Sequence, residues 1–248
     1  MSLRLEQTPS LIDLLRLRGR TALFAAASAV GLVLAGYAVT RAGFPIWGGT
    51  VMFLGVIAVP ATLKWRDDLA FYGTAACVLS VLLALQGFHT IEHIVQLLQF
   101  YVFDQAPVNS QGLISSLDVE WVHFIWNWLA WGCVVYLVRN GMKGLWGYPL
   151  LAWITAHSLE HTFMLLNYLH VAAELGQLGL PIFGSAQVLP GILGRDGWLA
   201  TNVPLCRNMI GLTTLPRVAI HFWWNFGEMS LLLLAARESL PKLIRRGR

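Results

Sequence analysis

Charged residues are scarce in this chain of 248 residues, where Asp, Glu, Lys and Arg together make up only 12%. A soluble domain carries roughly twice that share, about 25%. Hydrophobic residues reach 56%, and the mean hydropathy is +0.61. A composition this poor in charge excludes an ordinary soluble domain and predicts a helical membrane protein.

Cysteine is scarce as well, because the chain has only Cys77, Cys133 and Cys206, and none of them belongs to a CxxC pair. This excludes a disulfide framework. The net charge of +4 does not indicate a nucleic-acid partner, because basic residues gather beside apolar runs, as they do at a membrane surface. The partner that the composition predicts is the lipid bilayer.

Long apolar runs predict an all-α polytopic protein with six transmembrane helices, at about 21–40, 44–63, 71–103, 119–139, 146–171 and 216–236. A bilayer core needs about 20 apolar residues, so the longer third run is expected to tilt or to project beyond the membrane. Residues 1–20 are predicted to be a cytoplasmic interfacial segment, in which SLIDLLRLR (10–18) forms an amphipathic helix that Ser10 caps. Its leucines are expected to face lipid: Leu11, Leu14 and Leu15.

Lys and Arg predict the orientation, because cytoplasmic segments carry an excess of them. If the N-terminus is cytoplasmic, the segments on the other side keep only Arg41, Arg195, Arg207 and Arg217. We therefore predict that both termini are cytoplasmic and that 104–118 and 172–215 are outer loops. The basic tail, 237–248, is then a cytoplasmic segment beside anionic lipid.

An internal repeat runs through the last four predicted spans. It pairs HTIEHIVQLLQFYVF (89–103) with HSLEHTFMLLNYLHV (157–171), and VHFIWNW (122–128) with IHFWWNF (220–226). The repeat predicts a two-helix unit at 71–139 and its copy at 146–236, related by a pseudo-two-fold axis along the membrane normal. Residues 21–63 lie outside the repeat and predict two scaffold helices.

Histidines in the repeated motifs are spaced to bind metal. Residues i and i+4 lie one above the other on a helix, so two imidazoles can face one ion. The predicted ligands are His89, His93, His123, His157, His161, His221, Glu92 and Glu160. Ionisable groups inside a membrane are expensive and normally functional. We therefore expect a dinuclear centre in the outer half of the membrane, with two ions of copper, iron or zinc per chain.

Carboxylates and amides near these histidines are candidates for further roles. Glu92, Glu160 and Glu228 are the predicted catalytic residues, as bases or as bridges between two ions. Asn127 and Asn225 lie one turn from a repeated histidine, where each is predicted to hydrogen-bond a ligand. A structural role, in which each asparagine side chain hydrogen-bonds a neighbouring helix, explains their presence equally well.

The HxxEH order is similar to that of the inverzincin metalloproteases, in which the glutamate is the general base. Two copies inside predicted spans argue against proteolysis. The HxxxH pairs also resemble those of membrane desaturases and fatty-acid hydroxylases, whose HxxHH boxes this chain lacks.

The function that we favour from the sequence is a membrane-bound oxidoreductase acting on a lipophilic or small substrate. One alternative is a haem-binding electron-transfer subunit, because facing helices can ligate haem through two imidazoles. Another is a non-catalytic metal-binding subunit or carrier within a larger membrane complex. Partner subunits or a second copy of the chain are expected in either case.

Overall fold

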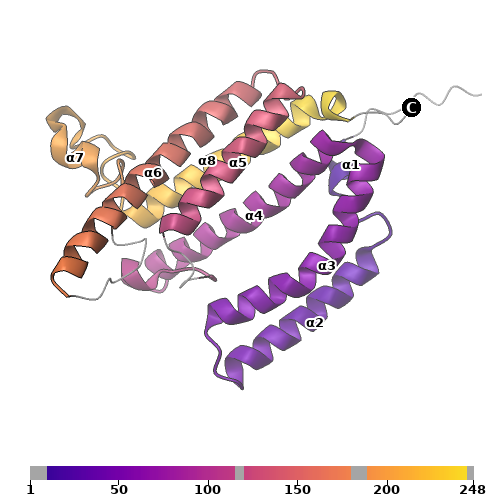
Figure 1. Ribbon diagram of the computed structural model, residues 1–248, viewed down its shortest axis with the longest axis horizontal. Coiled ribbons are helices and arrows are strands. Elements are labelled where there is room, and N and C mark those ends of the chain that lie inside the picture. Colours follow the sequence, from indigo (N-terminus) through magenta and orange to yellow (C-terminus); the bar gives the residue numbers. More distant parts are fainter. Residues whose placement is uncertain (1–9, 115–119, 180–188, 245–248) are drawn as a thin grey trace, which may run out of the picture.

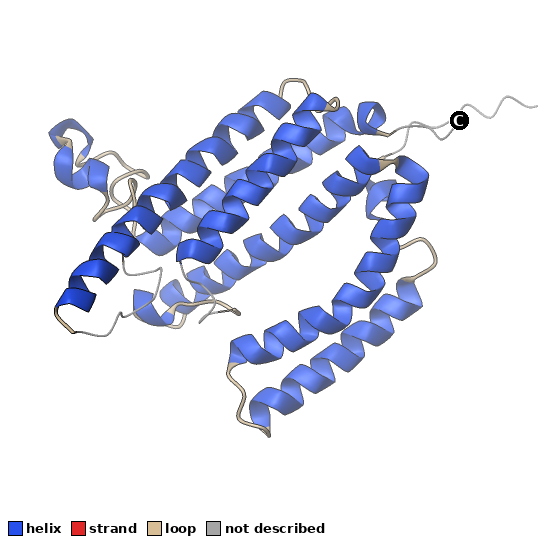
Figure 2. Cartoon of the chain, in the orientation of Figure 1, coloured by secondary structure: helices blue, strands red, loops and turns tan. Residues whose placement is uncertain are grey.

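The computed structural model describes residues 10–114, 120–179 and 189–244, and every regular element in these ranges is helical (Figure 1, Figure 2). The long helices are α2 (Thr21–Thr40), α3 (Ile46–Tyr72), α4 (Thr74–Tyr101), α5 (Glu120–Arg139), α6 (Gly147–Gln177) and α8 (Arg217–Leu243). The short ones are α1 (Leu11–Leu15), α7 (Trp198–Asn202) and the 3-10 turns η1 (Pro107–Asn109) and η3 (Pro204–Cys206). The predicted all-α class is confirmed.

Five helices are long and apolar enough to cross a membrane: α2, α3, α4, α5 and α8. The helix α6 is not among them, although it has 31 residues. Polar side chains such as His157, Glu160 and His161 lower its hydropathy. The predicted count of six spans is therefore not confirmed, although a long helix occupies each of the six predicted positions.

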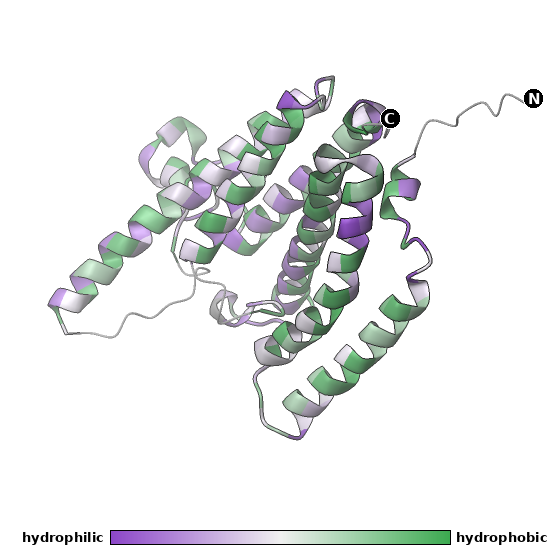
Figure 3. Cartoon of the chain, turned by 45° about the vertical axis from the view of Figure 1, so that its right-hand side comes forward, coloured by the Kyte–Doolittle hydropathy of each residue, from purple (hydrophilic) through white to green (hydrophobic). Residues whose placement is uncertain are grey.

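Many large apolar side chains on the long helices are exposed. Figure 3 shows that hydrophobic residues make up much of these helices. On α2, for example, Val33 is 71% exposed and Leu32 is 63% exposed. Soluble monomers rarely expose apolar patches of this extent. The surface therefore suits lipid.

The helices α4, α5, α6 and α8 form a bundle in which α4 packs against α8 and α5 packs against α6. A hairpin of α2 and α3 lies beside the bundle, where α3 contacts α4 (Figure 1). The apolar core fills one end of the bundle, from residues in the first halves of α4 and α6 and the second halves of α5 and α8. We call the other end, where His89, His123, His157 and His221 lie, the histidine end.

The N-terminal helix α1 agrees with its prediction at the cap and differs on its apolar face. The side chain of Ser10 caps α1 by accepting a hydrogen bond from the N–H of Asp13. Leu14, predicted to face lipid, is instead fully buried in the core. Its carbonyl accepts a hydrogen bond of 2.8 Å from Nζ of Lys64. An amphipathic pattern identifies an apolar face but does not say whether lipid or protein covers it.

The helix α3 continues well beyond its predicted end at residue 63. Lys64 and Asp68, one turn apart, form a buried ion pair, and the hydroxyl of Ser80 donates a 2.7 Å hydrogen bond to Asp68. These charges suggested the end of a span. Because Lys64 and Ser80 offset the buried charge of Asp68, the helix does not need to end where the charges begin.

Candidate metal centre

Six histidines from four helices meet at the histidine end. Two each come from α4 and α6, and one each from α5 and α8: His89, His93, His157, His161, His123 and His221. Centroids of neighbouring rings lie between 4.6 and 6.1 Å apart. All six side chains are buried. The structure thus brings together every histidine that the repeat singled out, but among the described residues only His89, His93 and His123 bring their ligand atoms within 4.8 Å of one another, and the second predicted triad, His157, His161 and His221, does not.

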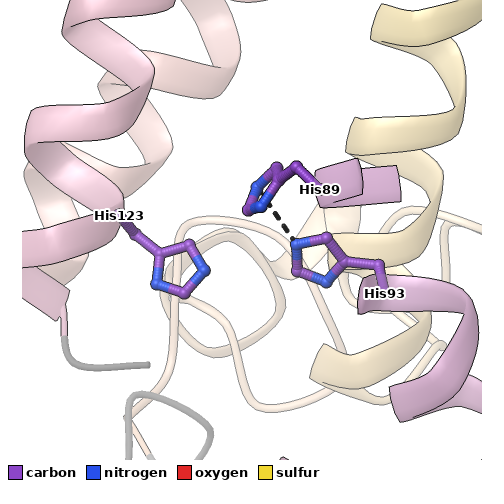
Figure 4. A group of neighbouring side chains, drawn as sticks. All are labelled: His89, His93 and His123. Atoms are coloured by element: carbon purple, nitrogen blue, oxygen red, sulfur yellow. Dashed lines mark hydrogen bonds between the residues drawn. The ribbon is translucent and has the colours of Figure 1, made fainter. Parts of the chain in front are cut away.

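His89, His93 and His123 have the geometry of a metal-ligand set (Figure 4). One ring nitrogen from each lies within 4.8 Å of the other two. The Nε2 atoms of His89 and His93 are 3.3 Å apart. Two nitrogens bound tetrahedrally to one zinc ion, each at about 2.0–2.1 Å, lie about 3.3 Å from each other. The group can therefore hold a metal ion with little movement of the two α4 rings.

Polar neighbours set the orientation of two rings. Nδ1 of His93 lies 2.8 Å from the amide oxygen of Gln96, which can only accept, so Nε2 is the nitrogen that presents a lone pair. Nδ1 of His157 lies 2.9 Å from Oε2 of Glu228, and the other oxygen of this carboxylate, Oε1, accepts a hydrogen bond from Gln86. A carboxylate behind an imidazole fixes the ring and strengthens it as a metal ligand.

His161 and His221 are buried with ring nitrogens that no protein group satisfies. Within the described ranges, neither ring nitrogen of either residue has a hydrogen-bond partner, and Nε2 of His157 lacks one as well. The exposed fractions of His161 and His221 are 0% and 2%. Buried polar atoms are nearly always hydrogen-bonded, so these ring nitrogens are exceptions that could bind a ligand.

The glutamates of the two HxxEH motifs hold loops at the histidine end. Glu92 accepts hydrogen bonds of 2.8 and 3.0 Å from the backbone N–H groups of Leu113 and Ile114. Glu160 accepts bonds of 3.0 and 3.3 Å from those of Ile192 and Leu193. These contacts make both glutamates loop anchors. Their role as metal ligands or bases stays a prediction.

A glycine precedes each anchored pair of amides, because the carboxylate comes very close to the backbone. A Cβ atom on Gly112 or on Gly191 would overlap Oε1 of Glu92 or of Glu160. The repeat therefore includes GLI at 112–114 and GIL at 191–193. The HxxEH motifs alone do not indicate these two glycines. The signal that could have found them is the Gly-apolar-apolar order shared by the segments after the two helices.

Asn127 and Asn225 each brace their own helix. Their side-chain amides donate to the carbonyls of His123 and His221, at 2.9 and 3.0 Å. The Oδ1 atoms of both asparagines have no hydrogen-bond partner in the described part of the chain. Their predicted contact with a ligand stays a prediction.

Sequence reasoning missed the ion pair between Glu120 and Arg217, at the starts of α5 and α8. Oε2 of Glu120 also lies 3.9 Å from Nδ1 of His161. The sequence carried a signal for the position of each residue but not for their pairing, because Glu120 precedes His123 by three residues and Arg217 precedes His221 by four. Residues at these spacings share a helix face.

No protein-family model, curated protein or solved structure matches this chain. A function therefore has to be argued from the residues and geometry of the site itself.

Proposed function

We propose that this protein is an integral membrane metalloprotein whose histidine cluster binds two transition-metal ions, and that it is an oxidoreductase acting on a lipophilic or small substrate. The observation that carries the proposal is the convergence of ring nitrogens from His89, His93 and His123 within 4.8 Å, in a buried position. Imidazole ligands suit copper, iron and zinc. Copper or iron would supply the redox chemistry.

The contacts of the HxxEH glutamates favour redox chemistry over hydrolysis. A zinc hydrolase of the HxxEH type uses the glutamate of the motif as a base beside the metal-bound water. Glu92 and Glu160 instead accept hydrogen bonds from loop N–H groups. In an oxidoreductase their task is to hold the loops that cover the histidine end and keep bulk water out.

The pairing of the histidines across the repeat supports the proposal of two ions per chain. His89 and His93 are matched by His157 and His161, with ring centroids 4.6 and 4.9 Å apart within the pairs. His123 stacks on His161 at 5.1 Å, which links one half of the cluster to the other. Ions in the two halves would lie close enough to influence each other.

We propose a six-span topology with α6 as the remaining span, both termini cytoplasmic and the histidine end toward the outer side. A pseudo-two-fold axis would exchange α4 with α6 and α5 with α8. Such an exchange turns the α4–α8 contact into the α5–α6 contact, and the bundle contains both. The matched loop anchors of Glu92 and Glu160 support the same symmetry.

The ring packing speaks against the haem alternative. Bis-imidazole ligation places a macrocycle between two rings, with the iron bound to one nitrogen of each. Here the imidazoles pack directly on one another, at centroid distances from 4.6 to 6.1 Å. A haem would require the helices that carry them to separate.

Metal content of the purified full chain in detergent tests the proposal. We expect two ions in the wild type and loss of one in His93→Ala, with weaker binding of the other. His161→Ala should do the same from the other half. His170→Ala is the matched control, because His170 lies on α6 with a side chain that is 75% exposed, beside Glu174. A reversible change in the electron paramagnetic resonance spectrum on reduction would support the oxidoreductase assignment.

Wild-type protein that stays metal-free after incubation with copper, iron and zinc would defeat the proposal. Protein that binds only zinc, and shows no redox change with copper or iron, would remove the oxidoreductase assignment and leave the metal site.

A further inference from the structure

We propose that Glu120 is a ligand of the second ion, together with His161 and His221, and that Arg217 competes with this ion for the Glu120 carboxylate. The inference rests on the proposed function, to which it adds a ligand and a competing residue.

The three donor groups are buried, and His161 neighbours both of the others, although their ligand atoms are not as close together as those of His89, His93 and His123. The rings of His161 and His221 have centroids 5.1 Å apart. Oε2 of Glu120 lies 3.9 Å from Nδ1 of His161, which is too long for a hydrogen bond. Ligand atoms on one ion are separated by about 3 Å, given metal–ligand distances of about 2.0–2.2 Å. Glu120 would therefore have to move about 1 Å toward His161 for the two to share an ion, and His221 would have to turn toward the same ion.

The chemistry of this set is that of a divalent transition-metal site. Two imidazoles and one carboxylate are the ligands of many non-haem iron(II) centres, and zinc accepts them as well. The four ring nitrogens of His161 and His221 lack hydrogen-bond partners within the described residues, and an ion would satisfy one on each ring. The carboxylate would also offset part of the positive charge that an ion brings into a buried position.

Arg217 holds the same carboxylate from the other side. Its guanidinium pairs with Oε1 of Glu120 and donates to the carbonyl of Leu189. Arg217 also lines a cavity of about 340 Å³ at the histidine end, together with Leu189, Pro190 and Gly191. The arginine thus lies between this cavity and Glu120, where it can turn toward the cavity when an ion takes its place.

The exchange keeps the charge of Glu120 compensated in both states. A buried carboxylate without a cation is strongly destabilising. Arg217 provides that cation when the second ion is absent, and the ion provides it when present. An arginine with this role must lower the affinity for the ion, because the ion has to displace it.

Zinc titration of the metal-free full chain in detergent tests the proposal, with a competing chelator to measure both affinities. Glu120→Gln should lower the affinity for the second ion by about tenfold or more, because the loss of a residue that only supports a metal ligand already has an effect of this size. Arg217→Gln should have the opposite effect and raise the affinity for the second ion. Glu174→Gln is the control, because this α6 glutamate is exposed and lies outside the cluster. It should leave both affinities unchanged.

The opposite signs separate this proposal from a purely structural ion pair. A structural pair predicts that Glu120→Gln and Arg217→Gln weaken binding together, and that result would overturn the inference. So would unchanged second-ion affinity in Glu120→Gln. If that variant does not fold, Glu120→Asp keeps the charge and shortens the reach, and wild-type affinity in Glu120→Asp would likewise count against Glu120 as a ligand.

The wild-type result distinguishes failure of this inference from failure of the proposed function. If the wild type binds one ion per chain and His89→Ala loses it, the first site is supported. The second site and the role of Glu120 as its ligand are then refuted. Absence of any bound ion would remove the proposed function itself.

Discussion

Replacing Gly191 with alanine should detach the loop that Glu160 holds. The new Cβ would overlap Oε1 of Glu160, so the carboxylate or the loop must move. Glu160 then loses its bonds of 3.0 and 3.3 Å to the N–H groups of Ile192 and Leu193. Hydrogen bonds to charged groups contribute about 1.5–3 kcal/mol each. Because these bonds are only partly buried, the lower value applies, and we expect a loss of about 3 kcal/mol for the two bonds.

Gly112 provides a second test with an added term. A Cβ there meets Glu92 in the same way, but Gly112 also has φ +77°. A side chain in this left-handed region costs roughly 1–2 kcal/mol. Gly112→Ala should therefore destabilise by about 4–5 kcal/mol, more than Gly191→Ala, through the sum of both effects.

Gly36→Ala is the control, because Gly36 lies inside α2 with open space where its Cβ would be. It should stabilise the protein by about 0.5–1 kcal/mol through helix propensity alone. Thermal unfolding in detergent gives the ranking, and backbone hydrogen exchange at 112–114 and 191–193 locates the change. If Gly191→Ala unfolds like Gly36→Ala and its loop amides stay protected, the glutamates do not hold the loops.

Three further predictions concern other parts of the chain. Lys64→Met removes the closest cation of the fully buried Asp68 and should cost about 3–5 kcal/mol in thermal unfolding, most of which Asp68→Asn in the same chain should restore. Glu228→Gln removes the charge behind His157 and should weaken metal binding by about 10–100-fold in a zinc titration. Asn109→Cys, in a chain without the native cysteines, should react with a membrane-impermeant thiol reagent on intact cells, because Asn109 is exposed; labelling only after lysis would reverse the proposed orientation.

The helical framework was predictable because it follows from local patterns. The first apolar run coincides with α2, and the fourth differs from α5 by a single residue. Histidine convergence was predictable for a similar reason, since i,i+4 pairs share a helix face and the repeat puts both pairs at the same depth. Hydrophobic periodicity and the internal repeat are therefore sufficient to predict most of the helices and the position of the site.

The partners of the acidic residues were not predictable, because they depend on contacts between distant segments. The HxxEH spacing puts Glu92 on the flank of the histidine face, about 60° from His89 and 100° from His93 at 100° per residue. Nothing in that spacing says whether an ion or a loop lies on the flank. The pairing of Glu120 with Arg217 joins residues 97 positions apart, so no local pattern contains it.

The separation of the bundle into two ends has a consequence for stability. The apolar core lies at one end and needs no ligand, because its side chains from α4, α5, α6 and α8 pack on one another. The histidine end instead buries imidazole nitrogens that no described protein group satisfies, each at a cost of about 1–3 kcal/mol. A ligand that binds only the folded state adds stability as its concentration rises above its dissociation constant, about 4 kcal/mol at a thousandfold excess. Metal should therefore protect the amides of the histidine end from exchange and leave those of the core end nearly unchanged, because the imidazole nitrogens that an ion can bind lie at the histidine end.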